Sequence, residues 1–178
     1  MNRTSRTGAA ILSLLASGSA AAQPLAPCLT TPEAEALVIT AVPALVTSLA
    51  VVCAPALPPS ALLRQPDNPY GARYVAAGDA AWPTAKTGLA KIAGPDMQPL
   101  LESDLARPMI SAMAGPLVAK DFKPADCAPT DRLLTALAPL TPRQAATAFV
   151  ALFQLADGGR KIDDRKKSAL PLCPLGRK

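Results

Sequence analysis

The sequence contains no histidine, and this absence excludes several functions at once. A Ser/His/Asp or Cys/His nucleophilic centre, an imidazole metal ligand and a histidine pH switch all need that side chain. Aromatic residues are scarce, with three Phe, two Tyr and one Trp among 178 residues. With 10 glycines and four cysteines, the chain also resembles neither collagen nor a small disulfide knot.

Alanine is the most abundant residue in the chain. The chain has 37 alanines, and alanine has the highest helix propensity of the amino acids. The 20 prolines lie mainly where helices would start, kink or stop, so they are compatible with a helical chain. We therefore predict an all-α fold, a single-domain bundle of four to six proline-kinked helices.

The first 22 residues have the three-part layout of a secretory signal peptide. Arg3 and Arg6 give a basic start, residues 9–17 are apolar but too few to cross a bilayer, and small residues precede a cleavage site after Ala22. The sequence therefore predicts a cleaved signal peptide over residues 1–22. We expect the protein to be periplasmic or secreted.

All four cysteines follow the predicted cleavage site: Cys28, Cys53, Cys127 and Cys173. An even number of cysteines in an exported chain predicts two disulfides. The cysteines are far apart and lack the closely spaced pairs of a zinc site. We therefore expect neither a metal nor another cofactor.

The length of the first helix limits how the cysteines pair. An unbroken helix between Cys28 and Cys53 would be roughly 30 Å long, whereas a disulfide needs Cα atoms within about 7 Å. Pairing these two would require a hairpin at Pro43, which has no Gly, Asn or Asp beside it. We favour Cys53 with Cys127 and Cys28 with Cys173. A bond between Cys127 and Cys173 stays an alternative, because it would close the C-terminal part of the chain.

The first helix is predicted to begin near Thr31, at the capping signature Thr31-Pro32-Glu33. No charge follows between Glu35 and Arg64. A segment that is apolar on every face is either the central helix of a soluble bundle or a membrane span, here over Ala36 to Ala54. A proline within the segment and several hydroxyl side chains favour the bundle, and the span is the alternative.

The clearest periodicity is a row of large apolar residues four apart: Leu101, Leu105, Met109, Met113 and Leu117. Residues four apart lie on one face of a helix, so the row predicts a helix with one apolar face. We expect this face to belong to the core. A groove for an apolar ligand is the alternative, because methionine adapts to irregular partners.

Three other helices are predicted, over about 70–93, 126–138 and 142–156. The last two are joined by a short connection at Pro139, so we expect them to form an antiparallel hairpin. In the final helix the apolar face that is expected to pack on the core consists of Ala145, Ala148, Phe149, Leu152, Phe153 and Ala156.

The basic character of the protein lies in its C-terminal tail. Residues 160–178 hold seven of the 18 Lys and Arg residues and two acids, which divides the chain after the signal into a helical domain over 23–159 and a basic tail over 160–178. Five tail cations are candidates for contact with an anionic membrane surface: Arg160, Lys161, Arg165, Lys166 and Lys167. No aromatic is interleaved to stack on bases, so nucleic acid is not an expected partner.

No catalytic motif is recognisable, and this leaves only carboxylates for acid and base chemistry. The close carboxylate pairs are Glu33 with Glu35, Glu102 with Asp104, and Asp163 with Asp164. The sequence leaves the biochemical function open and favours a non-enzymatic module that binds a protein or an apolar small molecule. A membrane-associated protein and an enzyme with unidentified carboxylate chemistry are the alternatives.

Overall fold

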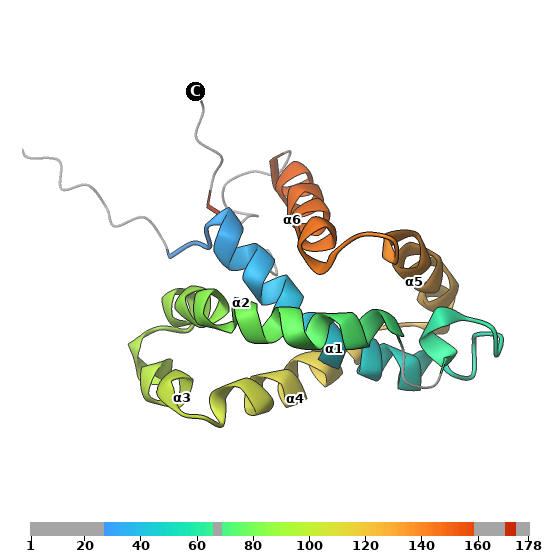
Figure 1. The fold of residues 1–178 in the computed structure, drawn as a ribbon, viewed down its shortest axis with the longest axis horizontal. Coiled ribbons are helices and arrows are strands. Elements are labelled where there is room, and N and C mark those ends of the chain that lie inside the picture. Colours follow the sequence, from blue (N-terminus) through green and yellow to red (C-terminus); the bar gives the residue numbers. More distant parts are fainter. Residues whose placement is uncertain (1–26, 66–68, 159–169, 174–178) are drawn as a thin grey trace, which may run out of the picture.

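The long uncharged segment of the chain forms the helix against which the others pack. The computed structural model describes residues 27–65, 69–158 and 170–173, and in it this segment is α1, Thr31–Cys53. Helix α2 (Pro69–Ala93) and helix α4 (Ala106–Ala119) pack along α1, and helix α6 (Pro142–Gly158) lies beside its N-terminal half (Figure 1). The remaining elements are η1 (Leu62–Arg64), η2 (Pro95–Met97), α3 (Gln98–Glu102) and α5 (Pro124–Leu137). Regular structure in the described residues is helical, which confirms the predicted all-α fold.

A buried carboxylate fixes the start of α1. Glu33 accepts a hydrogen bond of 2.9 Å from the backbone N–H of Thr30 and pairs with Lys91 of α2, with 2.5 Å between Nζ and Oε1. Burial alone would raise the pKa of Glu33, but the Lys91 ammonium and the Thr30 donors outweigh it and hold the pKa below its ordinary value of 4.5. The same side chain therefore caps α1 and attaches it to α2.

Small residues allow α1 to pack closely against its neighbours. An added Cβ at Gly115 of α4 would lie 2.7 Å from the carbonyl oxygen of Ala44 and would also overlap Ser48 Oγ. An added Cβ at Gly78 of α2 would lie 3.6 Å from the Cα of Thr40. The two crossings are therefore made largely by backbone approaching backbone.

The largest buried cluster surrounds the C-terminal half of α1, where α2 and η1 meet it. Its larger members are Ile39, Val46, Leu49, Leu57, Leu63, Tyr70 and Tyr74. The hydroxyl oxygens of Tyr70 and Tyr74 lie 3.1 Å apart. Burial, with the hydrogen bond to Tyr70, raises the pKa of Tyr74, so its hydroxyl stays neutral over the ordinary pH range.

Two disulfides close the chain at opposite ends of α1. Cys53 bonds Cys127 at the start of α5, with Cα atoms 5.5 Å apart, and Cys28 bonds Cys173 with Cα atoms 4.9 Å apart. Beside the second bond, the Leu29 N–H donates to the carbonyl of Pro171 at 2.8 Å. This is the pairing that the sequence favours. Pro43 does not form a hairpin, because α1 continues through it as a helix.

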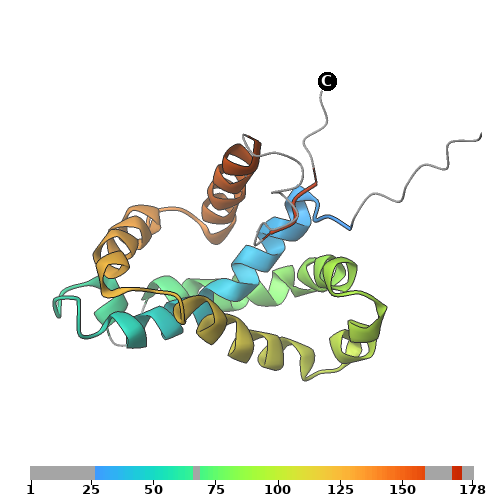
Figure 2. The ribbon, with the colours of Figure 1, turned by 180° about the vertical axis from the view of Figure 1, so that it is seen from behind.

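The expected hairpin between the last two helices is not formed. Cys127 holds α5 at the C-terminal end of α1, whereas α6 packs on the N-terminal half of α1, where Val150 joins a cluster with Leu29 and Ala34. Figure 2 shows α5 and α6 diverging from their connection. Ala145 and Ala146 at the start of α6 share the large cluster with Cys127 of α5, but Val150, one turn later, packs in the separate cluster at the N-terminal half of α1.

The predicted signal peptide over residues 1–22 and most of the tail over 160–178 lie outside the described residues. Within them, α1 is the one helix long and apolar enough to cross a membrane by length and composition.

Candidate functional site

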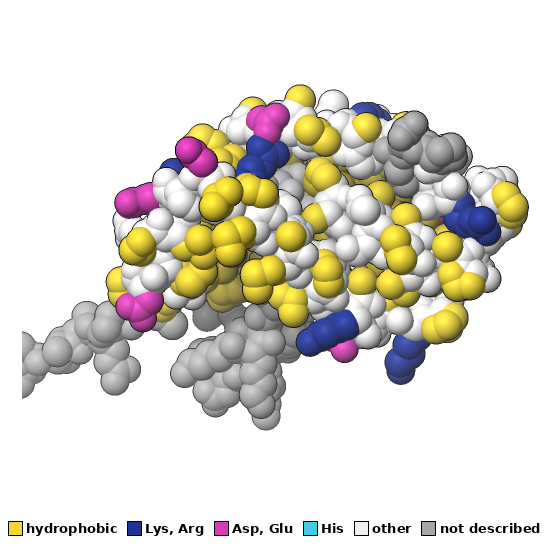
Figure 3. Space-filling view, turned by 90° about the horizontal axis from the view of Figure 1, so that it is seen from below, with side chains coloured by type: hydrophobic (Ala, Val, Ile, Leu, Met, Phe, Trp, Pro, Cys, Tyr) yellow, Lys and Arg dark blue, Asp and Glu magenta, His cyan; other side chains and the backbone are white. Residues whose placement is uncertain are grey.

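A row of large apolar side chains on α4 faces solvent. Leu105, Met109, Met113 and Leu117 are 65%, 46%, 62% and 55% exposed, and we call these four residues the α4 face. Figure 3 views the molecule from below α4 and shows hydrophobic side chains gathered over this region. The expectation that the row belongs to the core is therefore wrong for these four residues. Leu101, the first member of the row, is buried.

The opposite side of α4 explains why the large residues are left outside. The buried residues of this helix are Ala106, Gly115 and Ala119. Gly115 lies so close to α1 that even a methyl group would overlap its backbone, so this side cannot accommodate leucine or methionine. The small residues of α4 therefore face the scaffold and the large ones face outward.

The same inversion occurs on α6. Ala145, Ala146 and Val150 are buried, whereas Leu152 is 62% exposed and Phe149 lies partly in solvent at 37%. The expectation that Phe149 and Leu152 face the core is therefore wrong.

An apolar groove adjoins the α4 face. It has a volume of about 390 Å³ and lies between the C-terminal part of α1 and the end of α4. Val51 and Val52 line it from α1, and Pro116, Ala119 and Lys120 line it from α4 and its C-cap. Val51 is 74% exposed, so the groove extends the apolar surface of α4 onto α1.

Charges of opposite sign stand at the two ends of the α4 face. Glu102 and Asp104 precede it, Lys120, Asp121 and Lys123 follow it with a net charge of +1, and all five are exposed. The ion pairs in the described part of the chain are Glu33 with Lys91 and Asp79 with Arg107, so neither involves these five residues. The pair between Asp79 of α2 and Arg107 attaches the N-terminal turn of α4 to the scaffold.

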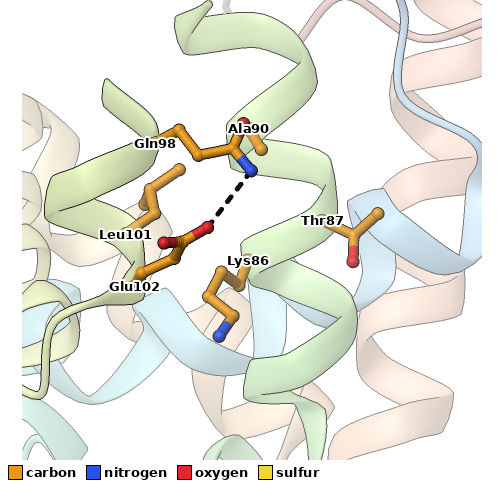
Figure 4. Close-up of a pocket in the computed structure, with 6 residues that line it drawn as sticks. All are labelled: Lys86, Thr87, Ala90, Gln98, Leu101 and Glu102. Atoms are coloured by element: carbon orange, nitrogen blue, oxygen red, sulfur yellow. Dashed lines mark hydrogen bonds between the residues drawn. The ribbon is translucent and has the colours of Figure 1, made fainter. Parts of the chain in front are cut away.

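A second hollow of about 260 Å³ lies where α2 faces α3 (Figure 4). Lys86, Thr87 and Ala90 line it from α2, and Gln98, Leu101 and Glu102 line it from α3. The amide of Gln98 donates to the carboxylate of Glu102 over 3.3 Å. This hollow contains one carboxylate, that of Glu102, whereas carboxylate catalysis needs an acid and a base side by side.

Of the carboxylate pairs singled out in the sequence, the first serves two separate helix contacts in the described residues. Glu33 pairs with Lys91 of α2, whereas Glu35 accepts a hydrogen bond of 2.8 Å from the hydroxyl of Thr147 on α6. The two side chains therefore serve different helix contacts. Glu102 and Asp104 are exposed beside the α4 face, and Asp163 with Asp164 lie outside the described residues.

The other sequence-derived candidates are located as follows. The four cysteines form the two disulfides. In the described ranges, no group of three or more Cys, Asp and Glu side chains could hold a metal ion. The five tail cations lie outside the described residues: Arg160, Lys161, Arg165, Lys166 and Lys167.

No protein-family model, curated protein or solved structure matches the chain.

Proposed function

We propose that the protein is an exported, non-enzymatic binding module, and that its partner binds at the α4 face. The observation that carries this proposal is the unbroken row of four exposed large apolar side chains on a helix whose other side is closely packed. Contiguous apolar surface of this kind marks interaction sites in soluble proteins. Methionines at two of the four positions suit a surface that adapts to its partner.

Export is supported by the disulfides and by the signal layout of residues 1–22. Two disulfides persist in oxidising compartments and are rare where thiols are kept reduced. This agrees with a periplasmic or extracellular protein.

The way α4 is held supports a ready-formed binding surface. Gly115 packs against the backbone of α1, and Arg107 pairs with Asp79 of α2. Because the helix is fixed on two sides, a partner would not have to order it on binding, and this lowers the entropic cost of association.

The membrane-span alternative meets a topological difficulty. The disulfides lie at the two ends of α1, so if α1 crossed a bilayer, the chain between Cys127 and Cys173 would have to cross it as well. The helices described in that interval are the rest of α5, which contains Asp131 and Arg132, and α6, which contains Arg143, Gln144 and Gln154. Neither is among the helices apolar enough to span. A soluble bundle needs no second crossing.

Photo-crosslinking in the producing cell tests the proposal. A photo-crosslinking amino acid at Met113 should give a crosslinked species in the material released by osmotic shock. The same amino acid at Ala76, which is exposed on α2, is the matched control and should give much less. Equal crosslinking at both positions, or retention of the protein in the cytoplasm, would contradict the proposal.

A further inference from the structure

We propose that the partner at the α4 face is a second copy of this chain, bound antiparallel about a twofold axis that crosses α4 at the level of Ser111. This inference rests on the proposed function, because it names the partner of the same surface. It is carried by the symmetry of the α4 face, by the charges at its two ends and by the adjoining groove.

The order of residue types along the α4 face is symmetric about position 111. Met109 and Met113 lie two residues on either side of position 111, and Leu105 and Leu117 lie six residues on either side. In a twofold contact the same patch is used by both copies, so a residue on one copy meets the residue equally far from the axis on the other. Antiparallel pairing therefore places Leu105 against Leu117 and Met109 against Met113, each twice.

The charges at the ends of the α4 face select the antiparallel direction. Two exposed acids, Glu102 at the end of α3 and Asp104, precede α4, whereas the exposed residues Lys120, Asp121 and Lys123 that follow it sum to one positive charge. Antiparallel pairing brings the acidic end of one copy, with Glu102, towards the cationic end of the other, with Lys120, at both ends of the contact. Parallel pairing would bring Glu102 towards Glu102 and Lys120 towards Lys120. Attraction in one direction and repulsion in the other would fix the orientation.

The available area fits a reversible dimer. The α4 face is about 18 Å long at 1.5 Å per residue. Val51 and Val118, which are 74% and 50% exposed, adjoin this face and extend the apolar contact at the C-terminal end of α4. Two copies would bury on the order of 1,000 Å² in total, which is near the lower limit for a specific interface. We therefore expect association at micromolar concentrations.

Sedimentation velocity on the processed, disulfide-bonded chain tests the pairing. Between about 1 µM and about 200 µM the mass should rise from one copy towards two. Met113→Glu should keep the chain at one copy throughout, because it places carboxylates in the centre of the contact. Val75→Glu, which makes the same kind of change at a 51% exposed site on α2, should dimerise like the wild type.

A charge exchange then tests the register. Glu102→Lys alone and Lys120→Glu alone should each weaken dimerisation about tenfold, because each change replaces two attractive pairs with repulsive ones. The double exchange should restore the dissociation constant to that of the wild type. Circular dichroism on each variant identifies any loss of helix that would imitate a loss of pairing.

The outcomes separate the two proposals. A chain that stays at one copy up to the highest concentration overturns the inference, and crosslinking from Met113 to another protein would then still support the binding module. A dimer unaffected by Met113→Glu, or one that the double charge exchange fails to restore, also overturns the inference. A chain that neither dimerises nor crosslinks from Met113 overturns both proposals.

Discussion

Replacing Gly115 with alanine tests the close crossing of α1 and α4 on which the exposure of the α4 face depends. The new Cβ would lie 2.7 Å from the carbonyl oxygen of Ala44 and would overlap Ser48 Oγ. The serine side chain can rotate away, but the carbonyl belongs to the backbone of α1, so α1 and α4 must move apart. Gly115→Ala should therefore destabilise the fold, although alanine is the better helix former.

The expected size follows from two opposing contributions. Overpacking of a well-packed contact costs about 1–3 kcal/mol, and the backbone overlap places this case near 3 kcal/mol. The change from glycine to alanine within a helix returns about 1 kcal/mol. The net loss is about 2 kcal/mol, which for a chain of this length lowers the unfolding midpoint by about 4–8 °C.

Thermal unfolding followed by circular dichroism at fixed pH, without reductant, measures this loss. Gly71→Ala is the matched control, because an added Cβ there lies 3.5 Å from Val46 Cγ1, an ordinary contact. The control should unfold at the wild-type temperature or slightly above it. Equal midpoints for the two variants would refute the close α1–α4 crossing and, with it, the reason given for the outward-facing row.

Three further outcomes are expected. Cys53→Ala with Cys127→Ala should lower the free energy of unfolding by about 2–4 kcal/mol, because the bond closes a loop with a sequence separation of 74. In the wild-type chain, intact mass after alkylation should show four thiols only after reduction. The lowered pKa of Glu33 means that its contribution to stability is present at neutral pH and is lost as the pH falls below about 4.5. The free energy of unfolding of Glu33→Gln, measured in urea, should therefore fall less than that of the wild type between about pH 6 and about pH 3. An equal fall would contradict the role given to the pair with Lys91. Alkaline carbonate should release the protein into the soluble fraction, whereas retention in the membrane pellet would favour α1 as a span.

Local signals in the sequence predicted the helices well. The Thr31-Pro32-Glu33 signature located the start of α1 to within a residue, although Thr30 takes the cap position and Glu33 closes the turn. The length of an unbroken helix separated Cys28 from Cys53 and so favoured the observed disulfides. Such features depend on neighbours along the chain, so the sequence alone contains the information.

Which face of α4 is buried could not be predicted in the same way. Periodicity predicts that large apolar residues are buried, and on α4 it predicted burial of Met109 and Met113. The face actually buried is that of Ala106 and Gly115, because a close helix crossing needs small residues. That preference depends on the helix across the contact, which a pattern within one helix does not reveal.

The nested arrangement of the two disulfides has a consequence for proteolysis. The bond between Cys28 and Cys173 closes a covalent ring, and the bond between Cys53 and Cys127 lies within it. A single cut anywhere between Cys28 and Cys173 therefore leaves one connected molecule. A chain cut once would retain its α1-centred packing, and its two pieces would separate only after the disulfides that join them are reduced.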